Sequence, residues 1–73
     1  MYNNFVTFVI KSKELISIVE SNGWELVRIK GSHYLLKHPK REGILIIPNH
    51  GSRTLGKGIA KKILKQAGVE WKR

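Results

Sequence analysis

The chain has 73 residues, of which 41% are hydrophobic and 26% are charged, and it contains no cysteine. A chain of this length forms one small domain with a compact core. Its composition is too apolar for an intrinsically disordered protein, and the lack of cysteine excludes both a disulfide scaffold and a zinc site built on thiolates. We therefore expect a single globular domain that suits a reducing compartment.

The charge of the chain is strongly positive and unevenly distributed. Fourteen Lys and Arg residues against five acidic residues give a net charge of +9. Residues 1–29 carry no net charge, so the whole excess lies from residue 30 onward. Because each Lys or Arg that meets a phosphate releases a condensed counterion, nucleic acid is the partner that this surface favours. An acidic protein is the alternative partner.

The first ten residues are the hardest part of the chain to interpret. Their aromatic and β-branched side chains favour a strand, but the segment is equally typical of an extension outside the domain. The apolar run over residues 5–10 is far shorter than the roughly 20 residues that a membrane-spanning helix needs. Because the run also lacks the flanking features of a signal peptide, we expect a cytoplasmic protein with no membrane segment.

The first predicted helix covers residues 13–22. Its apolar side chains recur at helical spacing and share one face. Ser12 is the expected N-cap, and Gly23 is the glycine expected to end the helix. The apolar face consists of Leu15, Ile18 and Val19.

The second predicted helix covers residues 59–67 and ends before Gly68. Its buried stripe is expected to be Ala60, Ile63, Leu64 and Ala67. A basic stripe beside it consists of Lys57, Lys61 and Lys65. Such a stripe is usually a solvated face, and in a protein this basic it is also a candidate RNA contact.

Three strands are predicted between the helices, over residues 24–30, 33–38 and 44–48. The two residues Gly31-Ser32 separate the first pair and predict an antiparallel hairpin. A polar turn over residues 39–43 leads to the third strand. We expect Trp24 and the Leu and Ile pairs of the strands to lie in the core. The order of elements predicts an α+β domain with two helices on one face of a three-stranded antiparallel sheet.

The residues available for catalysis are few. The chain contains no Asp, and its five Glu are scattered, so the paired carboxylates of a glycosidase or a two-metal nuclease are absent. The glycines of the loop over residues 49–58 do not have the spacing of a phosphate-binding loop. Three histidines remain as groups that can take and give a proton near neutral pH: His33, His38 and His50.

Histidine is sufficient for RNA cleavage, because the 2′-OH of RNA is an internal nucleophile beside the scissile phosphate. His33 directly follows the Gly31-Ser32 turn in a basic part of the chain, where an exposed imidazole can meet a phosphate. The cations on the same hairpin could stabilise the extra charge of a pentacoordinate transition state, and they are Arg28, Lys30 and Lys37.

Each histidine also has a structural interpretation. A histidine at the start of a strand is more often a surface or hydrogen-bonding residue than a catalyst, and this applies to His33. His38 precedes Pro39 and could shape a turn. His50 could be an RNA contact, a hydrogen-bonding loop residue or a metal ligand, and three histidines without carboxylate neighbours are a weak signal for a metal site.

Several motifs in the chain resemble those of one protein family. Their order and spacing over residues 11–69 are similar to the HicA (YcfA-like) mRNA interferase toxins. The motifs are Gly-Trp at 23–24, Gly-Ser-His at 31–33, Lys-His-Pro at 37–39 and Ile-Leu-Lys-Gln-Ala-Gly at 63–68. The resemblance implies a double-stranded-RNA-binding-like fold of α-β-β-β-α order, which agrees with the periodicity. Family members usually begin near Lys11, which implies a domain over residues 11–73 with residues 1–10 as an added segment.

The same resemblance implies the function. The catalytic histidine of the family lies in the Gly-[Ser/Gly]-His motif, which is His33 here, while the second proton-transfer group stays open among Lys37, His38, His50 and water. We expect a cofactor-free, metal-independent endoribonuclease of a type II toxin–antitoxin system, monomeric when free, that cleaves mRNA and is inhibited by a HicB antitoxin. The alternative is a non-catalytic RNA-binding module. The candidate RNA contacts are Arg28, Lys30, Ser32, Lys37, Lys57, Lys61 and Lys65.

Overall fold

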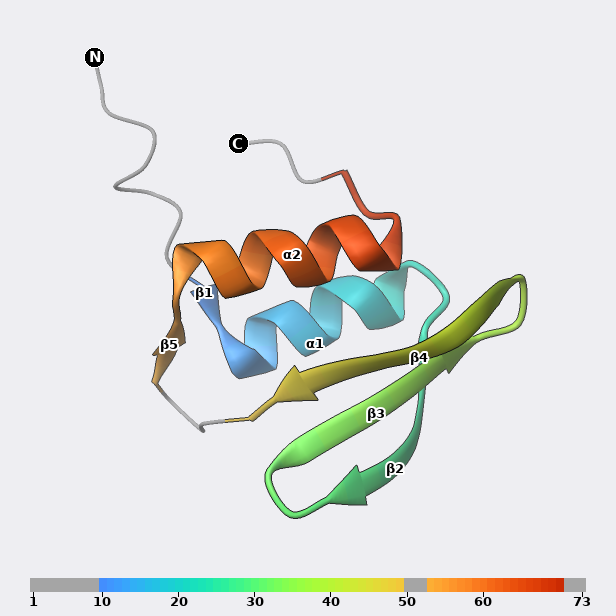
Figure 1. The fold of residues 1–73 in the computed structure, drawn as a ribbon, viewed down its shortest axis with the longest axis horizontal. Coiled ribbons are helices and arrows are strands. Elements are labelled where there is room, and N and C mark those ends of the chain that lie inside the picture. The colour runs from blue at the N-terminus through green and yellow to red at the C-terminus, as the bar shows by residue number, and fades with distance from the viewer. Residues whose placement is uncertain (1–9, 50–52, 71–73) are drawn as a thin grey trace.

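The computed structural model describes residues 10–49 and 53–70 of the chain. Strands β2, β3 and β4 form an antiparallel sheet in that order, and both helices lie along its β4 side (Figure 1). The predicted α+β fold with α-β-β-β-α order is confirmed. The elements in chain order are β1 (Ile10–Lys11), α1 (Ser12–Ser21), β2 (Glu25–Lys30), β3 (His33–His38), β4 (Arg41–Pro48), β5 (Thr54–Leu55) and α2 (Lys57–Ala67).

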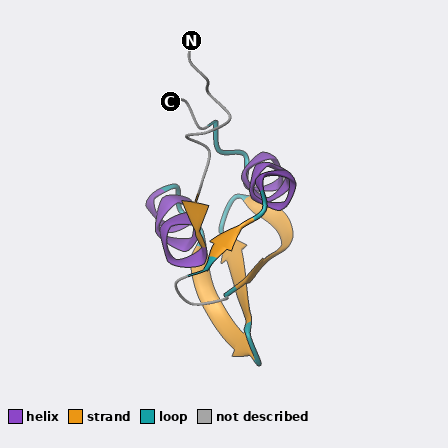
Figure 2. Ribbon diagram, turned by 90° about the vertical axis from the view of Figure 1, so that its left-hand side faces the viewer, coloured by secondary structure: helices purple, strands orange, loops and turns teal. Residues whose placement is uncertain are grey.

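The two helices form one layer and the sheet forms the other. The helices have ten and eleven residues, run side by side in the same direction and contact each other (Figures 1 and 2). Both helices contact β4, whereas every residue of β2 is exposed. Within the described ranges, no helix is long and apolar enough to cross a membrane.

The core lies between the helices and the sheet, and the inward-facing side chains of β3 and β4 are part of it. Successive residues of a strand point to opposite faces, so only one member of each apolar pair is buried. Leu36 and Ile47 are fully buried, whereas their neighbours Leu35 and Ile46 are partly exposed and exposed, respectively. Trp24 lies in the core, as predicted. The prediction that both members of each strand pair lie in the core is wrong for Leu35 and Ile46.

The start of α1 differs from the prediction. The N-cap residue is Lys11, and its backbone N–H donates a hydrogen bond to the Glu14 carboxylate at 2.9 Å. Ser12 is the first helical residue and is fully buried, and its hydroxyl donates to the carbonyl oxygen of Pro48 at 2.8 Å. Ser12 therefore does not cap the helix but ties its first turn to the end of β4.

Both predicted helix stops are confirmed. Gly23 follows α1 with a φ of 98°, and Gly68 caps α2 with a φ of 75°, a left-handed conformation that glycine adopts without steric cost. Helix α2 begins at Lys57, two residues before the predicted start, because the Ala60 N–H bonds to the Gly56 carbonyl and extends the first turn through Gly58.

Trp24 connects the beginning of the sheet to the end of α2. Its indole N–H donates to the carbonyl oxygen of Ala67 at 3.0 Å, and the hydrogen bond is buried. This bond satisfies one of the terminal carbonyls that a helix leaves without an internal partner. It therefore secures the last turn of α2 over the core.

Two features of the strands were not predicted. Strand β4 begins at Arg41 and not at residue 44, because the strand continues through an irregularity at which Gly43 has a φ of 89°. Within the predicted loop over residues 49–58, the short strand β5 pairs antiparallel with β1, with Ile10 opposite Leu55. Ile10 belongs to the segment that the sequence assigned to an extension, and it is buried in the core; residues 1–9 lie outside the described residues.

We expect Ser12→Ala to lower the free energy of unfolding by about 1–2 kcal/mol, because it leaves a partly buried carbonyl of Pro48 without this donor. The measurement is chemical denaturation followed by circular dichroism. Ser17→Ala on the exposed side of the same helix is the matched control, and it should be neutral or slightly stabilising. Equal effects of the two substitutions would contradict the role of Ser12.

Candidate active site

The sheet has a face that the helices leave uncovered, which we call the outer face. Cross-strand partners point to the same side, and Leu36 and Leu45 are buried partners on the helix side. The strand period of two then puts His33, Leu35 and Lys37 on the outer face. The predicted catalytic residue is thus accessible from the side opposite to the core.

His33 begins β3 and lies between Lys30 of β2 and Pro48 of β4 in the register of the sheet. Side chains of such partners stand about 5 Å apart at their Cβ atoms. An open hollow of about 740 Å³ adjoins the imidazole. It is lined by Lys30, Gly31, Ser32, His33, Leu35 and Ile46. The imidazole-bearing His33 and the cationic Lys30 therefore line the same open hollow.

The turn that carries His33 is held in place from two sides. Gly31 has a φ of 62°, as a glycine has at the first loop position of a type II′ hairpin turn. The carbonyl oxygen of Ser32 accepts a hydrogen bond from the backbone N–H of Asn49 at 2.7 Å. The carbonyl oxygen of Pro48, the neighbour of Asn49, accepts a hydrogen bond from the Ser12 hydroxyl of α1, so the turn is connected to the helix layer through this side chain.

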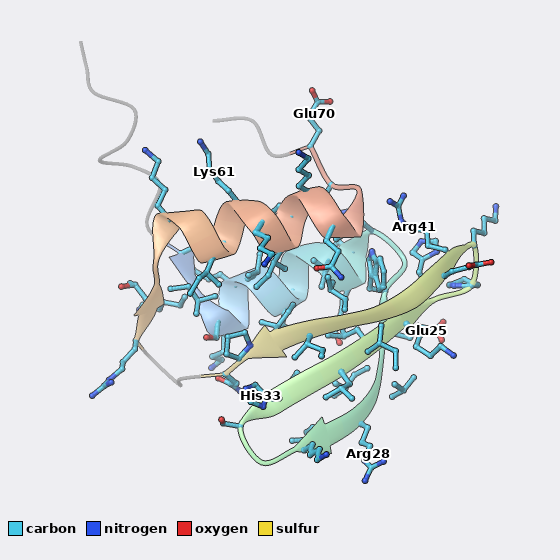
Figure 3. The ribbon with its side chains drawn as sticks, viewed as in Figure 1. Glu25, Arg28, His33, Arg41, Lys61 and Glu70 are labelled. Carbon is cyan, nitrogen blue, oxygen red and sulfur yellow. The ribbon has the colours of Figure 1, made fainter. Side chains whose placement is uncertain are left out.

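Two further predicted RNA contacts lie on the outer face. Arg28 is the partner of Leu35, and Figure 3 shows its side chain directed away from the helices. Lys37 is the partner of Glu25 in the register of β2 and β3. Along β3 these positions are about 7 Å and 13 Å from His33. The structure therefore brings Arg28, Lys30 and Lys37 together on the face that holds His33.

The predicted contacts on α2 lie in the other layer. Lys57, Lys61 and Lys65 are exposed, and Figure 3 shows Lys61 directed away from the sheet. Lys57 begins α2 at the end of the molecule where β1, β5 and the β2–β3 turn are found (Figure 1). Lys65 is about 12 Å farther along the helix. Of the three, only Lys57 lies at the same end of the molecule as His33.

His38, a candidate second proton-transfer group, has a structural role. The backbone N–H of Lys40 donates to its Nδ1 at 3.0 Å, so Nδ1 is unprotonated and the ring proton is on Nε2. Nε2 lies 3.0 Å from the carbonyl oxygen of Asn22, to which it donates. Both ring nitrogens are therefore engaged, at the opposite end of β3 from His33. His50 lies outside the described residues.

The surroundings of His38 explain why two of the motifs occur together. Its ring packs edge-on against Trp24, with a centroid distance of 5.4 Å. A Cβ atom at Gly23 would lie 2.6 Å from Nε2 of His38, and Gly23 also has a positive φ, so only glycine fits there. The Gly-Trp and Lys-His-Pro motifs form one contact that joins the end of α1 to the β3–β4 turn.

The aliphatic part of the hollow was not predicted from the sequence. Ile46 was assigned to the core, but it is 51% exposed and lies beside His33 and Leu35. The signal was present in the continuous apolar run from Ile44 to Ile47. A strand that is apolar on both faces has one apolar face uncovered if helices pack on only one side of its sheet.

A comparison with protein-family models now places the chain. A model described as HicA toxin of bacterial toxin-antitoxin matches residues 12–69, so this is a protein of the toxin class of bacterial toxin–antitoxin systems. Within that class the chain belongs to the HicA family, as its motifs indicated. A search of curated proteins found no match.

We expect His38→Ala to lower the free energy of unfolding by about 1–2 kcal/mol, because two backbone groups lose their partner and Trp24 loses a packing contact. His33→Ala on the same strand is the matched control, and its exposed side chain should change stability by less than about 0.5 kcal/mol. Thermal and denaturant unfolding measure both. A larger loss of unfolding free energy for His33→Ala than for His38→Ala would contradict the structural role assigned to His38.

Proposed function

We propose that this HicA-family toxin is an endoribonuclease with His33 as its catalytic residue. The observation that carries the proposal is the exposed imidazole of His33 opposite Lys30 on the outer face. Family membership supplies the biological context of a toxin that an antitoxin restrains. The strongly positive charge supports a polyanionic substrate, and we take that substrate to be mRNA.

The proposed reaction uses the 2′-OH of the RNA as the nucleophile. A base removes the 2′-OH proton, the 2′ oxygen forms a bond to phosphorus, and the bond from phosphorus to the 5′ oxygen breaks. An acid supplies the proton for the leaving 5′ oxygen, so the products are a 2′,3′-cyclic phosphate and a 5′-OH. His33 serves as the base or the acid in this step, and general acid–base catalysis of this kind contributes about 10²–10⁴-fold.

Lys30 is suited to stabilising the transition state. Lys30 lines the same hollow as His33, so its positive charge can act on the negative charge that builds up on the phosphorane. Ser32 lies in the same turn and offers a hydroxyl to a phosphate oxygen. The second proton-transfer group is His50 or water, because Lys37 lies about 13 Å from His33 along β3 and the hydrogen bonds of His38 commit its ring to the fold.

The remaining cations are proposed to hold the RNA away from the scissile bond. Arg28 and Lys37 extend the path of the bound RNA along the outer face. Lys57 stands at the end of the molecule where His33 lies, so RNA that passes around this end can reach α2. Lys61 and Lys65 continue that second path.

The proposed biological role follows from the family. The toxin cleaves mRNA in the cytoplasm and thereby arrests translation, and it acts as a monomer when free. A HicB antitoxin encoded beside it inhibits the enzyme. The family's toxin–antitoxin partnership supports the existence of such an inhibitor.

We expect the purified wild-type chain to cleave a labelled mRNA in the presence of EDTA and to leave 2′,3′-cyclic phosphate ends. His33→Ala should reduce the rate at least about 100-fold, since the variant loses an acid–base group. Equal cleavage by both proteins would refute the assignment of His33. RNA that is bound but recovered intact from both would instead favour a non-catalytic RNA-binding module.

We expect Lys30→Gln and the triple variant Lys57→Gln, Lys61→Gln and Lys65→Gln to differ in their kinetics. Lys30→Gln should lower kcat by about 10-fold or more, because its charge acts on the transition state. The triple variant should raise KM and reduce the salt dependence of binding, with kcat nearly unchanged, because its lysines meet phosphates remote from the reaction. Steady-state cleavage at several salt concentrations distinguishes the two patterns. A fall in kcat for the triple variant would place α2 at the scissile phosphate.

A further inference from the structure

A second open hollow lies at the end of the sheet that is remote from His33, and we call it the distal hollow. Its volume is about 590 Å³, within the range of small-molecule sites. It is lined by residues of β2, β3, β4 and the β3–β4 turn, and it shares no lining residue with the hollow beside His33. Figure 3 shows Glu25, which lines it, and His33 at opposite ends of the sheet. The distal hollow is therefore separate from the proposed catalytic residue.

Two carboxylates line the distal hollow. Glu25 of β2 and Glu42 of β4 are both exposed, and they are two of only five acidic residues in a chain with a net charge of +9. Glu42 directly precedes Gly43, at which a φ of 89° marks the irregularity of β4. Carboxylates repel phosphate, so this pair is unsuited to the RNA backbone and calls for a different ligand group.

Two cations also line the distal hollow, but they differ in their surroundings. The guanidinium of Arg41 lies against Gly68 at the end of α2, where an added Cβ atom would collide with it, and Figure 3 shows Arg41 directed to the helix layer. Lys37 is exposed and is the register partner of Glu25, with Cβ atoms about 5 Å apart. Lys37 is therefore the cation suited to holding a phosphate at the border of the hollow.

The carboxylates determine which chemical group the distal hollow can hold. An ionised carboxylate only accepts hydrogen bonds, so its ligand must present donors. In RNA, unpaired bases present such donors on their Watson–Crick edges. Guanine presents two neighbouring donors, the ring N1–H and the N2 amino group, which match carboxylate oxygens. A basic peptide also offers donors, but the net charge of +9 on the chain repels it.

We propose that the distal hollow binds an unpaired guanine of the RNA; this rests on the RNA substrate of the proposed function. Glu25 and Glu42 accept hydrogen bonds from the donors of the guanine edge, and Val27 and Pro39 give apolar contact to the base. Lys37 holds the adjoining phosphate. The hollow thereby selects the RNA sequence that is presented to His33.

The geometry sets the distance between the guanine and the cleaved bond. Lys37 lies about 13 Å from His33 along β3. This is about four nucleotides of a stacked strand at about 3.4 Å each, and fewer in an extended strand. Cleavage should therefore occur at a fixed position, about two to four nucleotides from the selected guanine.

The test uses substitutions that remove one negative charge and keep the shape of the side chain. Glu25→Gln and Glu42→Gln each replace a carboxylate oxygen of the distal hollow with an amide donor. Glu20→Gln is the matched control, because Glu20 is exposed on α1 and the change in net charge is the same. Unfolding curves establish that the variants remain folded, as is expected for exposed positions.

Binding is measured by fluorescence anisotropy with labelled oligouridines that contain one guanosine or one adenosine. All proteins carry His33→Ala in this assay, so that the RNA stays intact. We expect the guanosine oligonucleotide to bind about 10-fold more tightly than the adenosine one. Glu25→Gln and Glu42→Gln should each reduce this preference to about two-fold or less, whereas Glu20→Gln should keep it.

Cleavage is then mapped on the same guanosine oligonucleotide with His33 present. Wild type and Glu20→Gln should cut at one fixed distance from the guanosine. Glu25→Gln and Glu42→Gln should cut at several positions, because the base no longer fixes the register of the RNA on the sheet.

The outcomes separate this proposal from the proposed function. Equal binding of the guanosine and adenosine oligonucleotides overturns the base site, even if the wild type cleaves RNA. A guanosine preference that Glu20→Gln reduces as strongly as the other two substitutions reflects net charge and also overturns it. Selective loss of the preference in Glu25→Gln and Glu42→Gln supports the base site, even if the wild type proves unable to cleave RNA.

Discussion

Two short helices cover one face of this sheet, and that constraint determines the rest of the structure. Helices of ten and eleven residues are about 15–17 Å long, and they pack beside β4. The inward side chains of β3 and β4 meet them in the core, while β2 is exposed along its whole length. Within residues 10–49 and 53–70, no further element covers the outer face, so that face stays exposed in this part of the chain.

The outline of the fold was predictable because its signals are local. Gly23 and Gly68 end helices by adopting a backbone conformation that other residues avoid, and Gly31-Ser32 specifies a tight hairpin. The role of Ser12 was not predictable, because its hydroxyl bonds to Pro48, 36 residues away. The pairing of Ile10 with Leu55 is a contact of the same long-range kind, and two-residue strands leave almost no periodicity to detect.

In the candidate site too, local sequence signals were predictive and long-range contacts were not. The sequence singled out His33 from its turn and its motif, and the structure places it on the exposed face opposite a lysine. It left His38 open as a second proton-transfer group beside His33. What separates them is tertiary contact: the ring of His38 packs against Trp24 and makes hydrogen bonds with the Asn22 carbonyl and the Lys40 amide. The aliphatic character of the outer face also emerged only when the helices were seen to pack on one side.

The strict alternation of β4 has a consequence for how such a protein can diversify. Leu45 and Ile47 are fully buried and hold the fold together, whereas Ile44 and Ile46 between them contribute little to the core. Substitutions at the alternate positions can therefore remodel the exposed surface at little cost in stability. The exposed face of the sheet can thus change its chemistry while the interior stays the same.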